Sequence, residues 1–191
     1  MGNKSKYIGV ENKGNPVLLG KDPISSAVSS ITFDGIFDDT FSEYWVTLFD
    51  VTLDATSGQQ VLFKWRNSGS DITGTYYRNY RAISMNSANT TTTANGSYTD
   101  YNAITDYDMG TDSTREALNS VMYLFPRSAN IKYNFNDDLF VADSSNVYAS
   151  EFIGVLDTAT TMDGFSVYAS SGNIAGGEIC CLLYTSDAAD E

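Results

Sequence analysis

The sequence predicts an all-β protein, a single antiparallel β-sandwich of jelly-roll type preceded by an irregular N-terminal arm. From residue 29 onward, apolar side chains recur at every second position in short segments, which is the period of a half-buried strand. Glycine, asparagine, aspartate and serine, the residues of turns, separate these segments. Segments with the apolar period of a helix are almost absent. We therefore expect about eight to ten strands in one domain over residues 29–180.

Residues 1–28 are polar and rich in turn-forming residues, with one short apolar patch at 17–19. Because no period is sustained there, this segment is predicted to be an irregular arm that either contacts a neighbouring molecule or stays mobile. The alternation begins with Ile31 and Phe33, which are followed at once by an Asp-Gly turn signal.

The longest alternation is YWVTLFDVTL at residues 44–53, in which both alternating sets begin apolar. Such a strand is expected to lie inside a sheet and to be covered on both faces at one end. After a turn comes VLFKWR at 61–66, with Val61, Phe63 and Trp65 on one face. Because only a short run of turn residues separates the two strands, they are predicted to pair as a hairpin.

Later segments continue the alternation. They are TYYRNYRAISM at 75–85, VMYLFP at 121–126, NIKYNF at 130–135, EFIGVL at 151–156 and GFSVYA at 164–169. The apolar sets that mark their predicted core sides are Val121, Tyr123 and Phe125; Ile131, Tyr133 and Phe135; Phe152, Val155 and Leu156; and Phe165 and Val167. Two polar segments, 86–96 and 99–112, are predicted to be long exposed loops that form a recognition surface.

Composition excludes several functions. The 191 residues include 11 basic and 24 acidic side chains, for a net charge of −13, and no histidine. An acidic balance argues against a nucleic-acid partner, because phosphate backbones need clustered Lys and Arg. The lack of histidine removes Ser-His-Asp and Cys-His catalysis and histidine-bound zinc, and we expect no catalytic residues. No apolar run approaches the roughly 20 residues that span a bilayer, so no membrane insertion is expected.

The C-terminal residues 181–191, CLLYTSDAADE, resemble the translation of the mosaic-end adapter used in transposase-based sequencing libraries. We therefore expect this tail to be non-native and the sandwich to be truncated at its last strand. Both cysteines, Cys180 and Cys181, lie at or inside the tail, so neither disulfides nor cysteine-bound metals are expected. The stretch ICCLLYT is nevertheless strand-prone. It is predicted to occupy the slot of the authentic last strand, with the residues after Thr185 making no contacts.

The strongest ligand-binding candidate is the aromatic and basic stretch YYRNYR, which contains Tyr76, Tyr77, Arg78, Tyr80 and Arg81. Tyrosine rings and guanidinium planes stack well on sugars and on bases. On a strand, however, alternate tyrosines also cover a half-buried sheet face, so packing in the core or at an interface is the alternative interpretation.

Three aspartates, Asp106, Asp108 and Asp112, surround Gly110 and are candidate ligands for Ca²⁺, which prefers oxygen donors. The spacing departs from the helix-loop-helix calcium motif, because the glycine is fifth rather than sixth and no glutamate follows at position twelve. Apart from this ion, no cofactor is expected. Carboxylate pairs at 38–39 and 137–138 leave a glycan hydrolase open as an alternative, although their contexts are those of turns and surface charge.

Three segments carry a resemblance to a known family: ITFDGIFDDTFSEYWVTLFDV at 31–51, VLFKWRNSGSDITGTYYRNYRA at 61–82 and DGFSVYASSGNIAGGEI at 163–179. In their order and approximate spacing they resemble small virion structural proteins of tailed bacteriophages, of the tail-fibre or receptor-binding type. The resemblance spans residues 29–179 and describes packing rather than chemistry.

What the resemblance implies is a non-enzymatic component of the virion that acts through subunit packing and surface recognition. It implies a homo-oligomer, often a trimer, whose loops contact other virion proteins or a host-surface glycan. No catalytic residue is carried over. Two alternatives stay open: a stand-alone carbohydrate-binding module and, ranked below it, a carboxylate-based glycan hydrolase.

Overall fold

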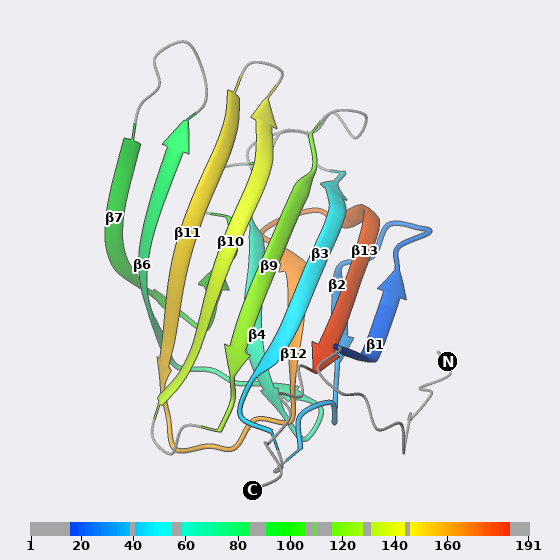
Figure 1. Ribbon diagram of the computed structural model, residues 1–191, viewed down its shortest axis with the longest axis vertical. Coiled ribbons are helices and arrows are strands. Elements are labelled where there is room, and N and C mark those ends of the chain that lie inside the picture. The colour runs from blue at the N-terminus through cyan, green and yellow to red at the C-terminus, as the bar shows by residue number, and fades with distance from the viewer. Residues whose placement is uncertain are drawn as a thin grey trace, which may run out of the picture.

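The computed structural model describes residues 16–38, 41–54, 59–84, 91–105, 109, 116–127, 131–143 and 146–183. Over these residues the chain forms two antiparallel β-sheets that pack face to face as a β-sandwich (Figure 1). The larger sheet lies in front in Figure 1, and the smaller sheet lies behind it. The predictions of an all-β protein and of a sandwich are confirmed.

The larger sheet has eight strands in the order β1-β13-β3-β9-β10-β11-β6-β7. Every neighbouring pair in it is antiparallel. Its strands are β1 (Val17–Pro23), β3 (Tyr44–Leu53), β6 (Thr75–Ser84), β7 (Thr91–Thr99), β9 (Leu118–Phe125), β10 (Ile131–Asp143), β11 (Asn146–Asp157) and β13 (Ile174–Leu183).

The smaller sheet has the order β2-β12-β4-β5, and β8 also pairs with β4. Its strands are β2 (Ser30–Phe33), β4 (Val61–Asn67), β5 (Ser70–Asp71), β8 (Asn102–Ala103) and β12 (Gly164–Ala169). Four pairs are nested along the chain: β1 with β13, β2 with β12, β3 with β9, and β4 with β8. Successive pairs alternate between the two sheets, while β10, β11, β6 and β7 extend the larger sheet beyond them.

The core between the sheets is aromatic. Phe63 and Trp65 of β4 are fully buried, and their rings meet edge to face with centroids 5.1 Å apart. Phe37 and Tyr44 pack across from them with centroids 4.6 Å apart, and Phe165 stacks on Phe63 at 6.0 Å. Such pairs add about 0.5–1.5 kcal/mol each to the burial of the rings themselves. The inward face predicted for residues 61–66 is therefore confirmed.

β3 changes phase at a bulge in its middle. Its pairing with β9 shifts register between Leu48 and Val51, and Asp50 has a left-handed backbone with a φ of 54°. Beside it, Gly177 also has a positive φ, and a Cβ there would lie 2.6 Å from the Asp50 carbonyl oxygen. The bulge lets Leu48 and Val51 both point into the core. It explains why both alternating sets of this strand are apolar, and it leaves Phe49 on the surface, 67% exposed.

The predicted irregular arm over residues 1–28 is wrong for seven of its residues, because Val17–Pro23 forms the edge strand β1. Residues 1–15 lie outside the described part of the chain. Gly20 faces the core so closely that a Cβ would lie 2.9 Å from a ring carbon of Phe33. The turn-like composition of this segment therefore reflects a register shift at Gly20 and close packing rather than a loop.

β13 continues into the predicted non-native tail. Residues 181–183 pair with β1 on one side and with β3 on the other, and Cys181 is fully buried. This is the placement expected for the strand-prone stretch ICCLLYT, as far as the structure describes it. Residues 184–191, including those predicted to make no contacts, lie outside the described residues.

The hairpin predicted between residues 44–53 and 61–66 is wrong. Both strands form, but β3 belongs to the larger sheet between β13 and β9, whereas β4 belongs to the smaller sheet beside β12. The connection crosses from one sheet to the other. β3 and β4 each have an apolar inner face. These faces bury more apolar surface when the strands pack face to face in two sheets than when they pair as neighbours in one sheet.

Candidate functional site

The five residues of the predicted ligand-binding stretch lie on β6 but divide between its two faces. Tyr76, Arg78 and Tyr80 point between the sheets, whereas Tyr77 and Arg81 point outward. A single ligand therefore cannot contact all five. The alternative interpretation, packing, applies to the inward set.

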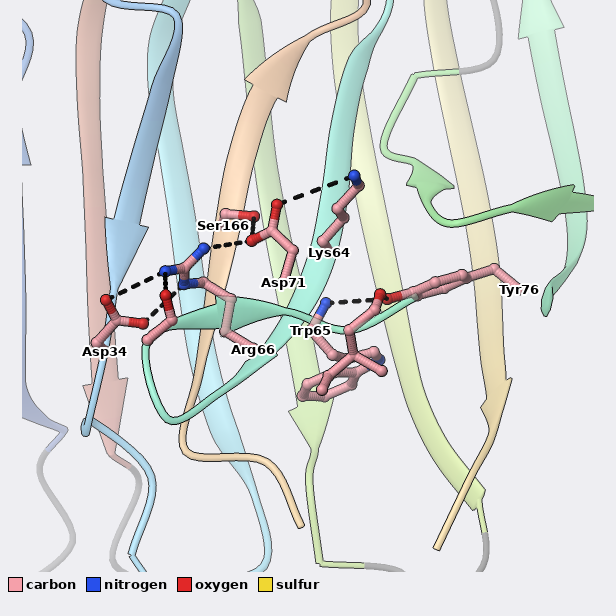
Figure 2. Close-up of polar contacts among 9 residues, drawn as sticks. Asp34, Lys64, Trp65, Arg66, Asp71, Tyr76 and Ser166 are labelled. Carbon is pink, nitrogen blue, oxygen red and sulfur yellow. Dashed lines mark hydrogen bonds and ion pairs between the residues drawn. The ribbon is translucent and has the colours of Figure 1, made fainter. Parts of the chain in front are cut away.

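Tyr76 is a structural residue. Its ring is fully buried, and its hydroxyl accepts a hydrogen bond from the Trp65 backbone N at 3.3 Å and donates one to the Ile72 carbonyl at 3.0 Å. The contact with Trp65 is visible in Figure 2. Burial raises the pKa of the Tyr76 hydroxyl. Tyr76 thus joins the larger sheet to the turn after β5.

Arg78 and Tyr80 stack on each other inside the sandwich, with the guanidinium carbon 5.4 Å from the ring centroid. Gly154 on the neighbouring strand β11 lies beside this pair. A Cβ on Gly154 would overlap the amides of Asn102 and Asn134, which hydrogen-bond to each other at 3.2 Å. The inner face is polar here, and protein side chains fill it. Arg78 therefore packs inside the sandwich rather than facing solvent.

The calcium candidates Asp106, Asp108 and Asp112 lie outside the described residues. Within the described part of the chain, no group of three Asp, Glu, His or Cys side chains is placed to hold a metal ion. The two predicted exposed loops, 86–96 and 99–112, are wrong where the structure shows a strand or burial: residues 91–99 form β7, and residues 102–105 are buried. Residues 86–90, 106–108 and 110–112 of these loops lie outside the described part of the chain. The described segments have polar sequences because edge strands and buried asparagines need no apolar period.

A charged network covers the outer face of the smaller sheet (Figure 2). The Arg66 guanidinium binds the carboxylate of Asp34 at 2.7 Å and also that of Asp71. Asp71 accepts a further hydrogen bond from the Ser166 hydroxyl at 3.0 Å and lies 3.9 Å from the Lys64 ammonium. The hydrogen bonds from Arg66 to these carboxylates raise its pKa.

This network connects three strands of the smaller sheet with the residue that follows a fourth. Arg66 and Lys64 come from β4, Asp71 from β5, Ser166 from β12, and Asp34 directly follows β2. Lys64 also lies over the ring of Tyr168 with 5.2 Å to its centroid, and burial raises the pKa of the Tyr168 hydroxyl. The charged groups drawn in Figure 2 thus bind each other, and this face is suited to holding strands together.

The outer face of the larger sheet has the opposite character. We call it the outer aromatic face; it consists of Trp45, Tyr77, Tyr123, Phe125, Phe135, Ile153, Val155 and Leu182, all half-buried or exposed. One cross-strand row runs Leu182, Trp45, Tyr123, Phe135 and Ile153 over five neighbouring strands. A second row includes Phe125, Val155 and Tyr77. No described element lies across this face, which is toward the viewer in Figure 1.

The rings of the first row contact one another. Trp45 and Tyr123 meet edge to face with centroids 5.5 Å apart, and Tyr123 lies 6.0 Å from Phe135. The Trp45 indole N–H donates to the Glu43 carboxylate at 2.6 Å. Exposure increases toward β11 and β6, where Ile153 is 47% and Tyr77 is 50% exposed. The face is therefore a packed apolar surface rather than a set of separate side chains.

β10 has the apolar side of its pattern on this face, whereas β9 has apolar side chains on both of its faces. Val121, Tyr123 and Phe125, predicted to face the core, point outward instead. On β10, Ile131 is 43% exposed, while Lys132 and Asn134 on the other face are buried. Burial lowers the pKa of Lys132, whose ammonium donates to the Thr158 carbonyl at 3.5 Å. The strands themselves are as predicted, but the assignment of their core sides is wrong.

The alternation of the sequence thus did not indicate that four residues lie on the outer face of the larger sheet: Trp45, Tyr123, Phe135 and Ile153. A signal was present in β9, where both alternating sets contain large apolar residues, which is not the pattern of a strand with one face in water. Comparisons of the chain with protein-family models, with curated proteins and with solved structures found no match. Among the described residues there is also no helix of the length and hydropathy that crossing a bilayer requires.

Proposed function

We propose that this protein is a non-enzymatic structural component of a tailed-bacteriophage virion, of the tail-fibre or host-attachment type. It acts by packing against other subunits and by surface contact. The observation that carries the proposal is the outer aromatic face. Two adjacent rows of large apolar side chains lie on the outside of a sheet whose inner face is already packed. Contiguous apolar patches of this kind mark interaction surfaces.

The finer fold proposal is a jelly roll with an enlarged sheet. A jelly roll is a long antiparallel ribbon wrapped so that its nested strand pairs alternate between two sheets. The pairs β1 with β13, β2 with β12, β3 with β9 and β4 with β8 support this arrangement. Two insertions, β6–β7 between β4 and β8 and β10–β11 between β9 and β12, then widen one sheet and enlarge its outer face.

The partners proposed are other virion proteins and further copies of this chain. The sequence resemblance alone favours a trimer, whereas the outer aromatic face favours the two-fold contact that is proposed below. A host-surface glycan is proposed as the external ligand. The site of action is the virion, assembled in the host cytoplasm.

Mass spectrometry of density-gradient-purified phage particles tests this function. Trypsin should release residues 67–78 and 116–127 as two 12-residue peptides. We expect both peptides in the particle fraction at the stoichiometry of a structural protein. Detection only in the soluble fraction of the lysate, with particles free of both peptides, would contradict the proposal. Adjacent tail or capsid genes in the recovered gene neighbourhood provide a second check.

A carbohydrate-binding module is the second candidate, favoured by the exposed ring of Tyr77, which lies on the same face of the larger sheet as Trp45 and Tyr123. Calorimetry against soluble host polysaccharides is the test, with Tyr77→Ala compared with Asn79→Ala, its outward neighbour on β6. Binding that is lost only in Tyr77→Ala, in a chain absent from particles, would favour this candidate. Release of reducing ends from the polysaccharide would instead favour a hydrolase.

A further inference from the structure

We propose that the outer aromatic face binds the same face of a second copy of this chain, so that two eight-stranded sheets stack front to front. The inference rests on the proposed function, because it names the subunit contact that a structural protein of this kind uses. The central row, Trp45, Tyr123, Phe135 and Ile153, would form the middle of the contact.

The face has the size of a protein interface. From β13 to β6 it crosses six neighbouring strands, which at a spacing of about 4.8 Å gives a width of about 24 Å. Along β9 its apolar side chains run from Val121 to Phe125, a height of about 20 Å once the side chains are included. The apolar area is therefore roughly 500 Å². A stable interface buries about 800 Å² per partner, of which the core is apolar and the rim polar.

The pattern of β10 points to burial of this face by something that the described chain does not supply. Its outward set includes Ile131 and Phe135, while its inward set includes Lys132 and Asn134. At these described positions the strand therefore has its larger apolar side chains on the open side of the sheet. Two such faces packed about 10 Å apart reproduce the geometry of an ordinary sandwich, in which both inner faces are apolar.

A second copy fits the face better than a sugar does. Sugar rings stack on aromatic faces that are flanked by hydrogen-bonding groups. Here Trp45 and Tyr123 are packed edge to face, the Trp45 N–H is bound to Glu43, and aliphatic side chains such as Ile153 and Val155 continue the surface. A patch about 24 Å wide is also wider than a short oligosaccharide requires. An isologous contact needs only that one face match itself, which the apolar rows of this face do, with the opposite charges of Arg81 and Glu151 facing each other beside them.

Electrostatics gives the contact a signature. Each chain carries a net charge of −13, so two copies repel each other, while the contact itself is apolar. Salt screens that repulsion without weakening the apolar contact itself. The dimer should therefore tighten as sodium chloride rises from 0.05 to about 0.5 M, the opposite of the behaviour of a charge-driven interface.

Sedimentation velocity of the full chain between about 1 and 100 µM tests the proposal. We expect a monomer–dimer equilibrium that shifts toward dimer with salt. Ile153→Asp and Ile153→Lys should each weaken the dimer by about 100-fold or more, because either charge is desolvated in the contact. If the dimer is lost with both the negative and the positive side chain, a change in the charge repulsion between the two copies cannot explain the loss. The matched controls Thr32→Asp and Thr32→Lys, at an exposed site on the outer face of the smaller sheet, should leave the dimer intact.

A second measurement does not depend on the variants. Trp65 is fully buried in the core, whereas Trp45 is on the outer aromatic face. Diluting the wild-type chain through the concentration range in which the dimer dissociates should shift the tryptophan emission to the red, because Trp45 becomes exposed to water. A wild-type chain that stays monomeric at all salt concentrations, a dimer indifferent to Ile153→Asp, a trimer, or a glycan that binds this face of a monomer would each overturn the proposal.

The two proposals fail separately. A chain found in purified particles but monomeric in solution overturns the dimer contact and leaves the virion function standing. A chain that dimerises through Ile153 but is absent from particles overturns the virion function alone.

Discussion

The two outer faces of the sandwich differ in the side chains that they present to solvent. On the smaller sheet, Arg66 and its two carboxylates form a network in which charged groups from several strands bind one another (Figure 2). On the larger sheet, Trp45, Tyr123 and Ile153 present apolar surface that no described element covers (Figure 1). On the smaller sheet the charged groups find their partners within the chain. On the larger sheet apolar side chains stay exposed to water. The difference indicates which face is available for a partner.

Among side-chain truncations, the largest expected effect is on the charged outer face of the smaller sheet. Arg66→Ala leaves two carboxylates without their cation, so the free energy of unfolding should fall by about 2 kcal/mol, moderated because both carboxylates are about a third exposed. Arg81→Ala, the matched control on the outer aromatic face side of the molecule, should change it by less than about 0.5 kcal/mol. Urea unfolding of both variants measures this. Equal losses would contradict the contrast between the faces.

A second prediction concerns the core between the faces. Burial raises the pKa of Tyr44 to about 12 and raises the pKa values of Tyr76 and Tyr168 as well. Above pH 10 the unfolded chain loses these protons while the folded chain keeps them, so stability should fall from pH 10 toward pH 12. Tyr44→Phe should make that decline shallower. An unchanged slope in urea unfolding across this range would contradict the assignment.

A smaller effect is expected at the sheet edge formed by β1. The Lys21 ammonium lies 2.5 Å from the Glu178 carboxylate, and this hydrogen bond lowers the pKa of Glu178 and raises that of Lys21. The resulting stability is present above the ordinary glutamate value of 4.5 and is lost as pH falls through the lowered value. At the alkaline end it is present below 10.5 and lost as pH rises through the raised value. Lys21→Met should flatten the acid limb of a thermal-unfolding profile, and an unaltered limb would rule the pair out.

The smallest effect is expected for the C-terminal tail. Deleting residues 186–191 should leave the free energy of unfolding unchanged within about 0.5 kcal/mol, since the last described strand ends at Leu183. A loss above about 1 kcal/mol would speak against a non-native tail. Cys181→Asp is the contrasting variant: Cys181 is fully buried between β1 and β3, and an uncompensated charge there should prevent folding.

Much of the fold was predictable from local pattern. The bounds of β3 agree with the predicted segment, and Phe63 and Trp65 point inward as expected. Pairing was less accessible, because alternation fixes two faces without naming a neighbour. β3 and β4 therefore formed in the predicted places but in different sheets. β1 escaped prediction because Gly20 and Pro23 imitate a loop, and β7 because a run of threonines has no apolar period.

The candidate site was the least predictable part, for a physical reason. Periodicity shows that Tyr123 and Met122 lie on opposite faces of β9, but it does not say which face is wet. The larger aromatic set was assigned to the core, whereas Met122 is the fully buried residue. The same ambiguity applies to β6, where Tyr76 is buried and Tyr77 is exposed. Only the packing of the second sheet decides between the two faces, and that is a long-range property.

Hydroxyl-radical footprinting of concentrated and dilute protein compares the two faces in one experiment. If the outer aromatic face is a contact between copies, Trp45, Tyr123 and Phe135 should be protected at about 100 µM and labelled at about 1 µM, while Tyr168 on the smaller sheet is labelled equally at both. Equal labelling of Trp45, Tyr123 and Phe135 at the two concentrations would contradict the assignment of this face as the interface.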